Sequence, residues 1–182
     1  MPYRSVFVLR NGNNIYLWTG TGWGKTTSAI GVALRAVGHG KKVVIVQFMK
    51  GRKDRIGEYR ARKLLGKKYE IHQFGRQGWV KLQKPSPVDK ELAEEGLEFA
   101  RKAAKQKPFL LILDEINLAI AVGLLGLKEV LEFLDYVPQK TTVYLTGRFA
   151  PKKLIDRADY ATDIRPIKHP LPLERVKKGI DY

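Results

Sequence analysis

The chain has 182 residues and carries 34 Lys and Arg against 18 Asp and Glu, which gives a net charge of +16. Hydrophobic residues make up 44% of the sequence and charged residues 29%, so the composition is that of a globular protein and excludes a disordered basic tail. The sequence has no cysteine, which excludes disulfides, thiolate metal sites and a cysteine nucleophile.

The first part of the chain predicts a strand, a helix and a second strand. Ile15–Thr19 is a short apolar run that ends in a glycine-rich turn. Thr26–Val37 follows with apolar residues at helical spacing, and Gly38 is the expected stop of that helix. Lys42–Phe48 is rich in β-branched residues, a pattern typical of a buried parallel strand.

The middle of the chain is less regular. Residues 50–68 are basic and interrupted by glycine, which indicates a loop with a partial helix, and Tyr69–Phe74 predicts a third strand. Ser86 is a good helix N-cap with Asp89 closing a capping box, so a helix is expected from there to about Lys105.

The last part continues the alternation. The predicted elements are a strand at Phe109–Leu113, two helical pieces within Ile116–Tyr136 broken near Gly123–Gly126, a strand at Thr141–Thr146, a short helix at Pro151–Ala158 and a strand at Tyr160–Ile164. Strands that alternate with helices predict an α/β fold, in which a mostly parallel sheet is flanked by helices. The length and the lack of a linker predict a single domain over residues 1–182.

The turn after the first strand has the pattern of a phosphate-binding loop. Its glycines let backbone N–H groups converge on phosphate oxygens, and the next helix begins at the same anion. Lys25 would supply a cation to the terminal phosphates, and the Thr26 hydroxyl is a candidate Mg²⁺ ligand. Thr19 stands where the general pattern has its first glycine, so an ordinary glycine-rich turn is the alternative. The expected ATP- and phosphate-binding residues are Gly20, Thr21, Gly22, Trp23, Gly24, Lys25, Thr26, Thr27 and Arg148.

Three further residues follow strands that should end beside this loop. Asp114 and Glu115 follow the fourth strand and are candidate metal ligands together with Thr26, although acids there also suit the start of a solvated helix. Arg148 follows the fifth strand and is a candidate clamp for the triphosphate, with an ordinary surface arginine as the alternative. Gln47 either orients water or Mg²⁺ or caps the end of its strand.

The positive charge is uneven along the chain. Residues 41–84 hold 14 Lys and Arg against three acids, an excess of 11. Such an excess suits a nucleic acid, an anionic small substrate or a lysine-rich thermophile surface. No apolar run approaches a membrane span, and the start of the chain lacks the features of a signal peptide, so the expected location is the cytoplasm.

An ordered set of segments along nearly the whole chain resembles the ATP:cob(I)alamin (corrinoid) adenosyltransferases of the CobA/CobO/BtuR type. These segments are Thr19–Thr27, Ala33–Lys41, Val46–Gly51, Ile112–Asn117, Leu145–Arg148, Ala150–Asp159, Ile167–Pro170 and Lys178–Ile180. Each segment alone is a weak signal, whereas the complete set in this order is specific.

The resemblance implies a RecA-like P-loop fold and a transferase that moves the 5′-deoxyadenosyl group of ATP to Co(I) of a reduced corrinoid and releases triphosphate. It implies Mg²⁺ or Mn²⁺ as the metal, and Lys25 and Arg148 as the catalytic residues that stabilise the leaving triphosphate. Trp79 stands where the family places an aromatic residue near the corrinoid, with a loop aromatic anchored on the core as the alternative. A reductase partner and a homodimer are candidate partners, no membrane is expected, and nucleic acid becomes unlikely.

Two other functions stay open at this point. One is a P-loop ATPase stimulated by nucleic acid, which the excess charge of residues 41–84 motivates. The other is a nucleotide-binding corrinoid carrier without efficient chemistry.

Overall fold

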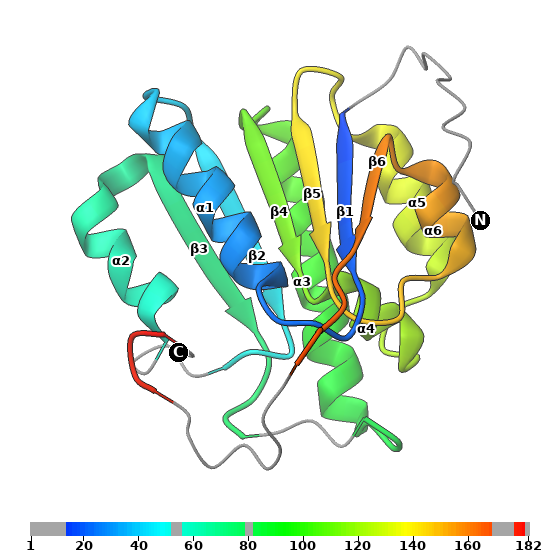
Figure 1. Cartoon of the computed structure of the whole chain (residues 1–182). Coiled ribbons are helices and arrows are strands. Elements are labelled where there is room, and N and C mark those ends of the chain that lie inside the picture. Colours follow the sequence, from blue (N-terminus) through cyan, green and yellow to red (C-terminus); the bar gives the residue numbers. More distant parts are fainter. Residues whose placement is uncertain (1–13, 52–55, 79–81, 169–176, 181–182) are drawn as a thin grey trace.

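Six strands form one sheet at the centre of the structure, in the order β3-β2-β4-β5-β1-β6 (Figure 1). The strands are β1 (Ile15–Thr19), β2 (Val43–Phe48), β3 (Tyr69–Phe74), β4 (Leu110–Asp114), β5 (Thr142–Thr146) and β6 (Tyr160–Asp163). All neighbouring strands pair in parallel, so the predicted α/β class is confirmed. The computed structural model describes residues 14–51, 56–78, 82–168 and 177–180.

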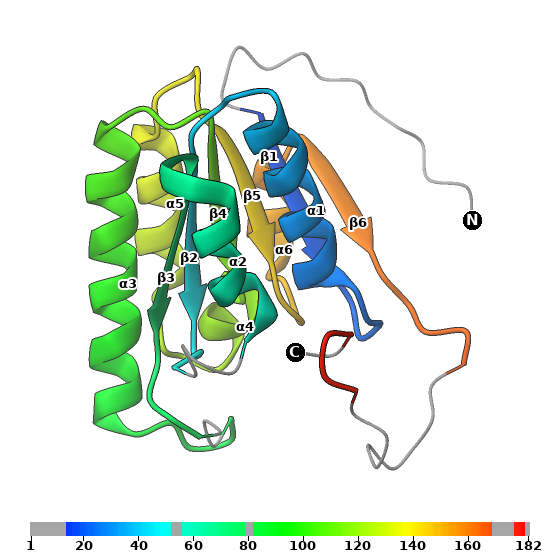
Figure 2. The same ribbon diagram turned by 90° about the vertical axis from the view of Figure 1, so that its left-hand side faces the viewer.

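Helices cover both faces of the sheet (Figure 2). The helices are α1 (Lys25–Gly38), α2 (Gly57–Leu65), η1 (Gly66–Lys68, a 3₁₀ turn), α3 (Pro87–Lys105), α4 (Ile116–Ala121), α5 (Leu127–Tyr136) and α6 (Lys152–Arg157). Helices α1 and α2 pack on one face, and α3, α4, α5 and α6 pack on the other. A parallel sheet needs this cover because its strands are buried on both sides.

Alanine residues bring the helices close to the sheet. Ala29, Ala33 and Ala36 recur at three- and four-residue spacing on α1 and are buried against strands β2 and β4. On α3, Ala93 and Ala100 bury the opposite face in the same way. The small side chains let each helix axis approach the sheet, which fixes where the helix ends lie relative to the strand ends.

Several predicted boundaries move. Strand β4 includes Asp114 as its last residue rather than ending one residue earlier, and β6 ends at Asp163 rather than Ile164. Gly38 belongs to α1 instead of stopping it, because the left-handed turn that leaves the helix is at Gly40, with φ of 69°. Within residues 50–68, the expected partial helix is α2, which ends at Leu65; Gly66, with φ of 71°, separates it from the 3₁₀ turn η1.

The capping box of α3 forms as predicted. The Asp89 amide donates to Ser86 Oγ at 3.2 Å, and the Ser86 amide donates to Asp89 Oδ2 at 2.9 Å. Arg76, from the loop after β3, donates to both carboxylate oxygens at 2.7 and 3.0 Å. The Asp89 side chain therefore ties the exit loop of β3 to the start of α3.

We expect Asp89→Ala to lower the free energy of unfolding by about 1–2 kcal/mol, since it removes the acceptor of the Ser86 amide in the capping box and the partner of Arg76. Burial alone would raise the pKa of Asp89, but hydrogen bonds from Arg76 and Ser86 outweigh burial and lower it. The ionised carboxyl thus stabilises the fold above its unfolded pKa, and that contribution disappears as the pH falls through the lowered folded pKa. Urea unfolding measures this at pH 7 and in acid. The difference in unfolding free energy between the unchanged protein and Asp89→Ala should be smaller in acid. Glu91→Ala, an exposed acid on the same helix, is the control.

Candidate functional site

The turn between β1 and α1 is shaped by the residue that follows β6. The Gly22 amide donates to the Ile164 carbonyl at 2.7 Å, and a Cβ on Gly22 would come within 2.8 Å of that oxygen. A Cβ on Gly20 would collide with the same carbonyl and with the Asp163 carboxylate. Gly24, with φ of 97°, is the left-handed N-cap of α1. Gly20 and Gly22 are therefore required because a side chain would not fit, and Gly24 is favoured because of its left-handed backbone.

Lys25 closes this loop on itself. Its side chain is 7% exposed, and its Nζ donates to the Gly22 carbonyl at 2.6 Å. Burial lowers the pKa of the Lys25 ammonium, and the Arg148 charge lowers it too, while Glu115 opposes the shift. In contrast, the side chain of Trp23 is 58% exposed and points away from the core. The other predicted residues of the loop that are exposed are Thr21 and Thr27.

Asp114 is the centre of the polar network next to the loop. One carboxylate oxygen, Oδ1, accepts from Thr26 Oγ1 at 2.8 Å and from Thr146 Oγ1 at 2.6 Å. The other, Oδ2, accepts from Lys50 Nζ at 2.7 Å and from Gln47 Nε2 at 3.0 Å. The carboxylate is fully buried, and these hydrogen bonds and the Lys50 charge offset the free-energy cost of its desolvation.

Electrostatics keep both members of the central ion pair charged. Burial alone would raise the pKa of the Asp114 carboxyl, but the Lys50 ammonium and the hydrogen bonds from Lys50 and two threonines outweigh it and lower that pKa. Burial alone would lower the pKa of Lys50, but the carboxylates of Asp114 and Glu58 outweigh it and raise that pKa. Asp114 is thus an anion at neutral pH, as a metal ligand must be.

Glu115 differs from its neighbour. It adopts a left-handed backbone, with φ of 66°, and its amide donates to Thr146 Oγ1 at 3.0 Å. Burial, and then the charge of Asp114, raise the pKa of the Glu115 carboxyl. Its Oε2 is buried without a hydrogen-bond partner. A buried, unpaired carboxyl oxygen next to Asp114 is a second oxygen that a divalent cation could use.

The third predicted element of the site, Arg148, follows β5 and is exposed. Gly147, with φ of 131°, turns the chain there, and Asn117 Nδ2 donates to its carbonyl at 3.2 Å. The charge of Arg148 is felt at both Lys25 and Glu115. The structure therefore brings Arg148, Lys25, Thr26, Asp114 and Glu115 to the same ends of neighbouring parallel strands. Trp79 lies outside the described residues.

The sequence did not single out Lys50, Glu58 or Asn117. Lys50 lies two residues beyond β2, and Glu58 lies on α2, where it accepts from Gln47 at 3.0 Å. Asn117 is buried, with Oδ1 unpaired, and its Nδ2 donates to the Trp18 carbonyl at 3.1 Å. Gln47, for which two functions were considered, is a hydrogen-bond donor to Asp114 and Glu58. The signal for Lys50 was its place after a strand that ends at this edge.

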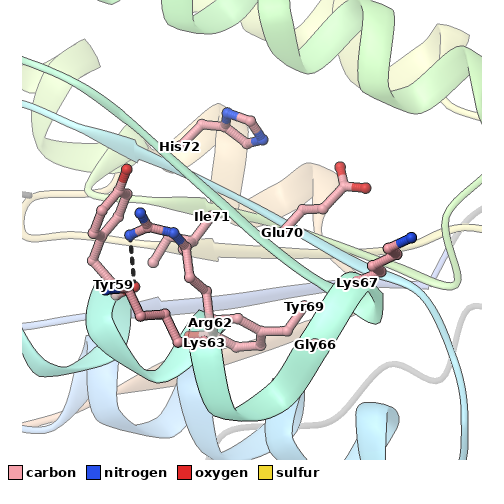
Figure 3. Close-up of a pocket in the computed structure, with 9 residues that line it drawn as sticks. All are labelled: Tyr59, Arg62, Lys63, Gly66, Lys67, Tyr69, Glu70, Ile71 and His72. Carbon is pink, nitrogen blue, oxygen red and sulfur yellow. Dashed lines mark hydrogen bonds between the residues drawn. The ribbon is translucent and has the colours of Figure 1, made fainter.

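A separate hollow of about 480 Å³ lies at the other edge of the sheet (Figure 3). Its walls come from α2, η1 and β3. The lining residues are Tyr59, Arg62, Lys63, Gly66, Lys67, Tyr69, Glu70, Ile71 and His72. Strand β3 is separated from β1 by three other strands, so this hollow is distinct from the phosphate loop. Its basic residues are part of the excess charge of residues 41–84.

Comparison with known proteins identifies the family of the chain. The family model of the ATP:corrinoid adenosyltransferase BtuR/CobO/CobP matches residues 11–182. The chain belongs to the ATP:corrinoid adenosyltransferase family. The predicted family, the α/β fold and the transferase class are confirmed, with ATP and a corrinoid as the substrates of the family.

Curated relatives of this family cover most of the chain. The corrinoid adenosyltransferase of Escherichia coli (strain K12) is 35% identical over 170 residues, which are 92% of this chain and 85% of the relative. Corrinoid adenosyltransferase CobA of Salmonella typhimurium is 34% identical over 171 residues, with the same coverage of both chains. The corrinoid adenosyltransferase of Pseudomonas aeruginosa is 32% identical over 181 residues, covering 98% of this chain and 84% of its own length.

No cluster of three or more His, Asp or Glu side chains suited to a metal occurs in the part of the chain that the structure describes. Within the same described ranges, no helix is long and apolar enough to cross a membrane.

Proposed function

We propose that this chain transfers the 5′-deoxyadenosyl group of ATP to Co(I) of a reduced corrinoid, with the loop from Gly20 to Thr27 as the triphosphate site. The cobalt electron pair forms a bond to the ribose 5′-carbon, the carbon–oxygen bond to the triphosphate breaks, and the triphosphate leaves with that bonding pair. The convergence of Lys25, Thr26 and Asp114 at one end of the sheet is the observation that carries the proposal.

Stabilisation of the leaving triphosphate is the proposed task of the protein. Negative charge grows on the oxygen that leaves, so donors held at fixed positions help the transition state more than the ground state. Lys25 and Arg148 are the proposed catalytic residues, and the backbone amides of the loop add further donors. Lys25 must exchange its hydrogen bond to the Gly22 carbonyl for a phosphate oxygen when ATP binds.

The residues present fit a magnesium ion bound together with the nucleotide. The Thr26 hydroxyl and the Asp114 carboxylate are 2.8 Å apart, both are oxygen ligands, and Glu115 Oε2 is buried without a partner. Mg²⁺, or Mn²⁺ in its place, would be held by Thr26 and Asp114, with Glu115 reached through water. When bound, the cation neutralises charge on the triphosphate oxygens.

The remaining assignments extend the same proposal. Residues 1–182 act as one P-loop domain in the cytoplasm, the chain forms a homodimer, and a reductase supplies the Co(I) corrinoid. Trp79 forms part of the corrinoid site. An anionic reductase surface would suit the basic residues of α2 and η1, which line the hollow in Figure 3.

The chemical products test this function. We expect the purified chain, given ATP, Mg²⁺ and a chemically reduced corrinoid, to form a light-sensitive adenosyl corrinoid and one triphosphate per product. The corrinoid absorption spectrum and chromatography of the phosphates measure both. Formation of ADP and phosphate, increased by added RNA or DNA, would instead indicate a nucleic-acid-stimulated ATPase. Binding of ATP without any turnover would indicate a carrier.

A further inference from the structure

The ammonium of Lys50 lies beside the two groups proposed to hold the metal. Its Nζ is 2.7 Å from Asp114 Oδ2 and 3.4 Å from Thr26 Oγ1. Those two residues are themselves joined by a 2.8 Å hydrogen bond between Thr26 Oγ1 and Asp114 Oδ1. The Lys50 ammonium thus contacts the same two side chains that are proposed to bind the metal ion.

The backbone holds Lys50 at this position. Met49, with φ of 58°, turns the chain after β2, and its amide donates to the Phe74 carbonyl at 2.8 Å. The exit loops of β2 and β3 then cross in direct backbone contact. A Cβ on Gly75 would come within 2.5 Å of the Lys50 amide nitrogen, and a Cβ on Gly51 would collide with the Gly75 carbonyl. The crossing therefore requires glycine on both loops, and it directs Lys50 toward the phosphate loop.

Lys50 pairs with the buried Asp114 carboxylate but is itself accessible to solvent. Its side chain is 22% exposed, whereas Asp114 is fully buried. A second carboxylate, that of Glu58, lies 3.6 Å away. A lysine has a flexible four-carbon stem, so its ammonium can change partners without movement of the backbone. Phosphate oxygens at the start of α1 would be such partners.

We propose that Lys50 is a phosphate-binding residue of this site that neutralises Asp114 until the metal–nucleotide complex arrives. The inference rests on the proposed function, because it takes Thr26 and Asp114 as the metal ligands. When ATP enters with its divalent cation, that cation takes over Asp114 and the Lys50 ammonium moves to a triphosphate oxygen. A free metal ion binds Asp114 only weakly, because without nucleotide it has to displace the Lys50 ammonium from its 2.7 Å contact and leave it the Glu58 carboxylate, 3.6 Å away, as its partner.

Metal binding without nucleotide tests the first part. We expect Lys50→Met to bind Mn²⁺ about tenfold or more tightly than the unchanged protein, because the competing charge is gone. Electron paramagnetic resonance of free Mn²⁺ measures the affinity in the absence of ATP and corrinoid. Lys42→Met removes a surface lysine that pairs with Glu70 and should change nothing. The double variant Lys50→Met with Asp114→Asn should lose the gain. An unchanged or weaker Mn²⁺ affinity in Lys50→Met would overturn the proposal.

Nucleotide binding to the metal-loaded protein tests the second part. At Mn²⁺ concentrations that saturate Asp114 in both proteins, we expect Lys50→Met to bind ATP about 10- to 100-fold more weakly, as for the loss of one charge-assisted hydrogen bond. Calorimetry measures this affinity, with Lys42→Met again as the control. Equal affinity in Lys50→Met and the unchanged protein would overturn the phosphate-binding role.

Two further variants protect these tests. Lys50→Gln keeps a donor for the buried Asp114 carboxylate, so it remains informative if Lys50→Met does not fold, and the same directions are expected of it. Asp114→Asn alone should weaken binding of the Mn²⁺–ATP complex. If Asp114→Asn leaves that binding unchanged, the metal assignment of the proposed function is wrong, whatever Lys50 does.

Discussion

Replacing Lys25 by alanine is expected to reduce the rate of adenosyl transfer by about 10²- to 10³-fold or more, as for the loss of one donor to a developing oxyanion. The ammonium is the protein charge at the first position of α1, and within the described residues its hydrogen-bond partner is the Gly22 carbonyl. The initial rate of adenosyl corrinoid formation at saturating ATP measures the loss.

The fold should tolerate this change. The Lys25 ammonium forms no salt bridge among the described residues, so its removal leaves no buried charge unpaired. We expect the melting temperature to change little. Arg35→Ala, which removes an exposed cation from the last turn of the same helix, is the control and should keep full activity. Near-normal transfer by Lys25→Ala would refute the assignment of the triphosphate site.

Replacing Asp114 by asparagine is expected to reduce both transfer and stability. The Asp114 carboxylate accepts four hydrogen bonds and donates none. An asparagine NH₂ at the Oδ2 position is itself a donor and would face two other donors, Lys50 and Gln47. Breaking a buried ion pair from one side costs about 3–5 kcal/mol of unfolding free energy. Transfer should fall about 100-fold or more because the metal loses its charged ligand. Urea unfolding and the Mg²⁺ dependence of the initial rate measure the two effects.

Glu115→Gln separates the two adjacent acids. Glu115 makes no salt bridge within the described residues, and burial and the Asp114 charge already raise the pKa of its carboxyl. Its replacement should therefore cost much less stability than that of Asp114, and it should weaken transfer only modestly if a water lies between it and the metal. The opposite order, with Glu115→Gln more damaging to the Mg²⁺ dependence, would exchange the roles of the two carboxylates.

The sequence was sufficient to predict the sheet and the loop because both depend on local patterns. Buried parallel strands are continuous apolar runs, and the strand–glycine turn–helix arrangement at Gly20–Lys25 is a short-range signature. The predicted end of the first helix was wrong, because Gly38 is still helical and Gly40 makes the left-handed turn. Which of two nearby glycines adopts the positive φ is not visible in the sequence.

The partners of Asp114 could be predicted only in part. Thr26 and Asp114 could be paired in advance, since the carboxyl ends of parallel strands meet at one edge of a sheet. Lys50 and Glu58 could not, because their places depend on the crossing of two loops and on how α2 lies over β2. Within a segment so rich in basic residues, the place of Lys50 two residues beyond β2 is the one local feature that distinguishes it, and that feature does not show which groups its ammonium contacts.

The contact of Gly20 and Gly22 with Ile164 has a consequence for the order in which the protein is made. Strand β1 pairs with β5 and β6, the last two strands in the chain, so it has no neighbour in the sheet until more than 120 residues have followed it. The phosphate loop cannot take its final shape before residue 164 is available. A nascent chain that stops short of β6 would thus contain every residue of the nucleotide motif and still lack a nucleotide site. ATP can stabilise only a chain that is nearly complete.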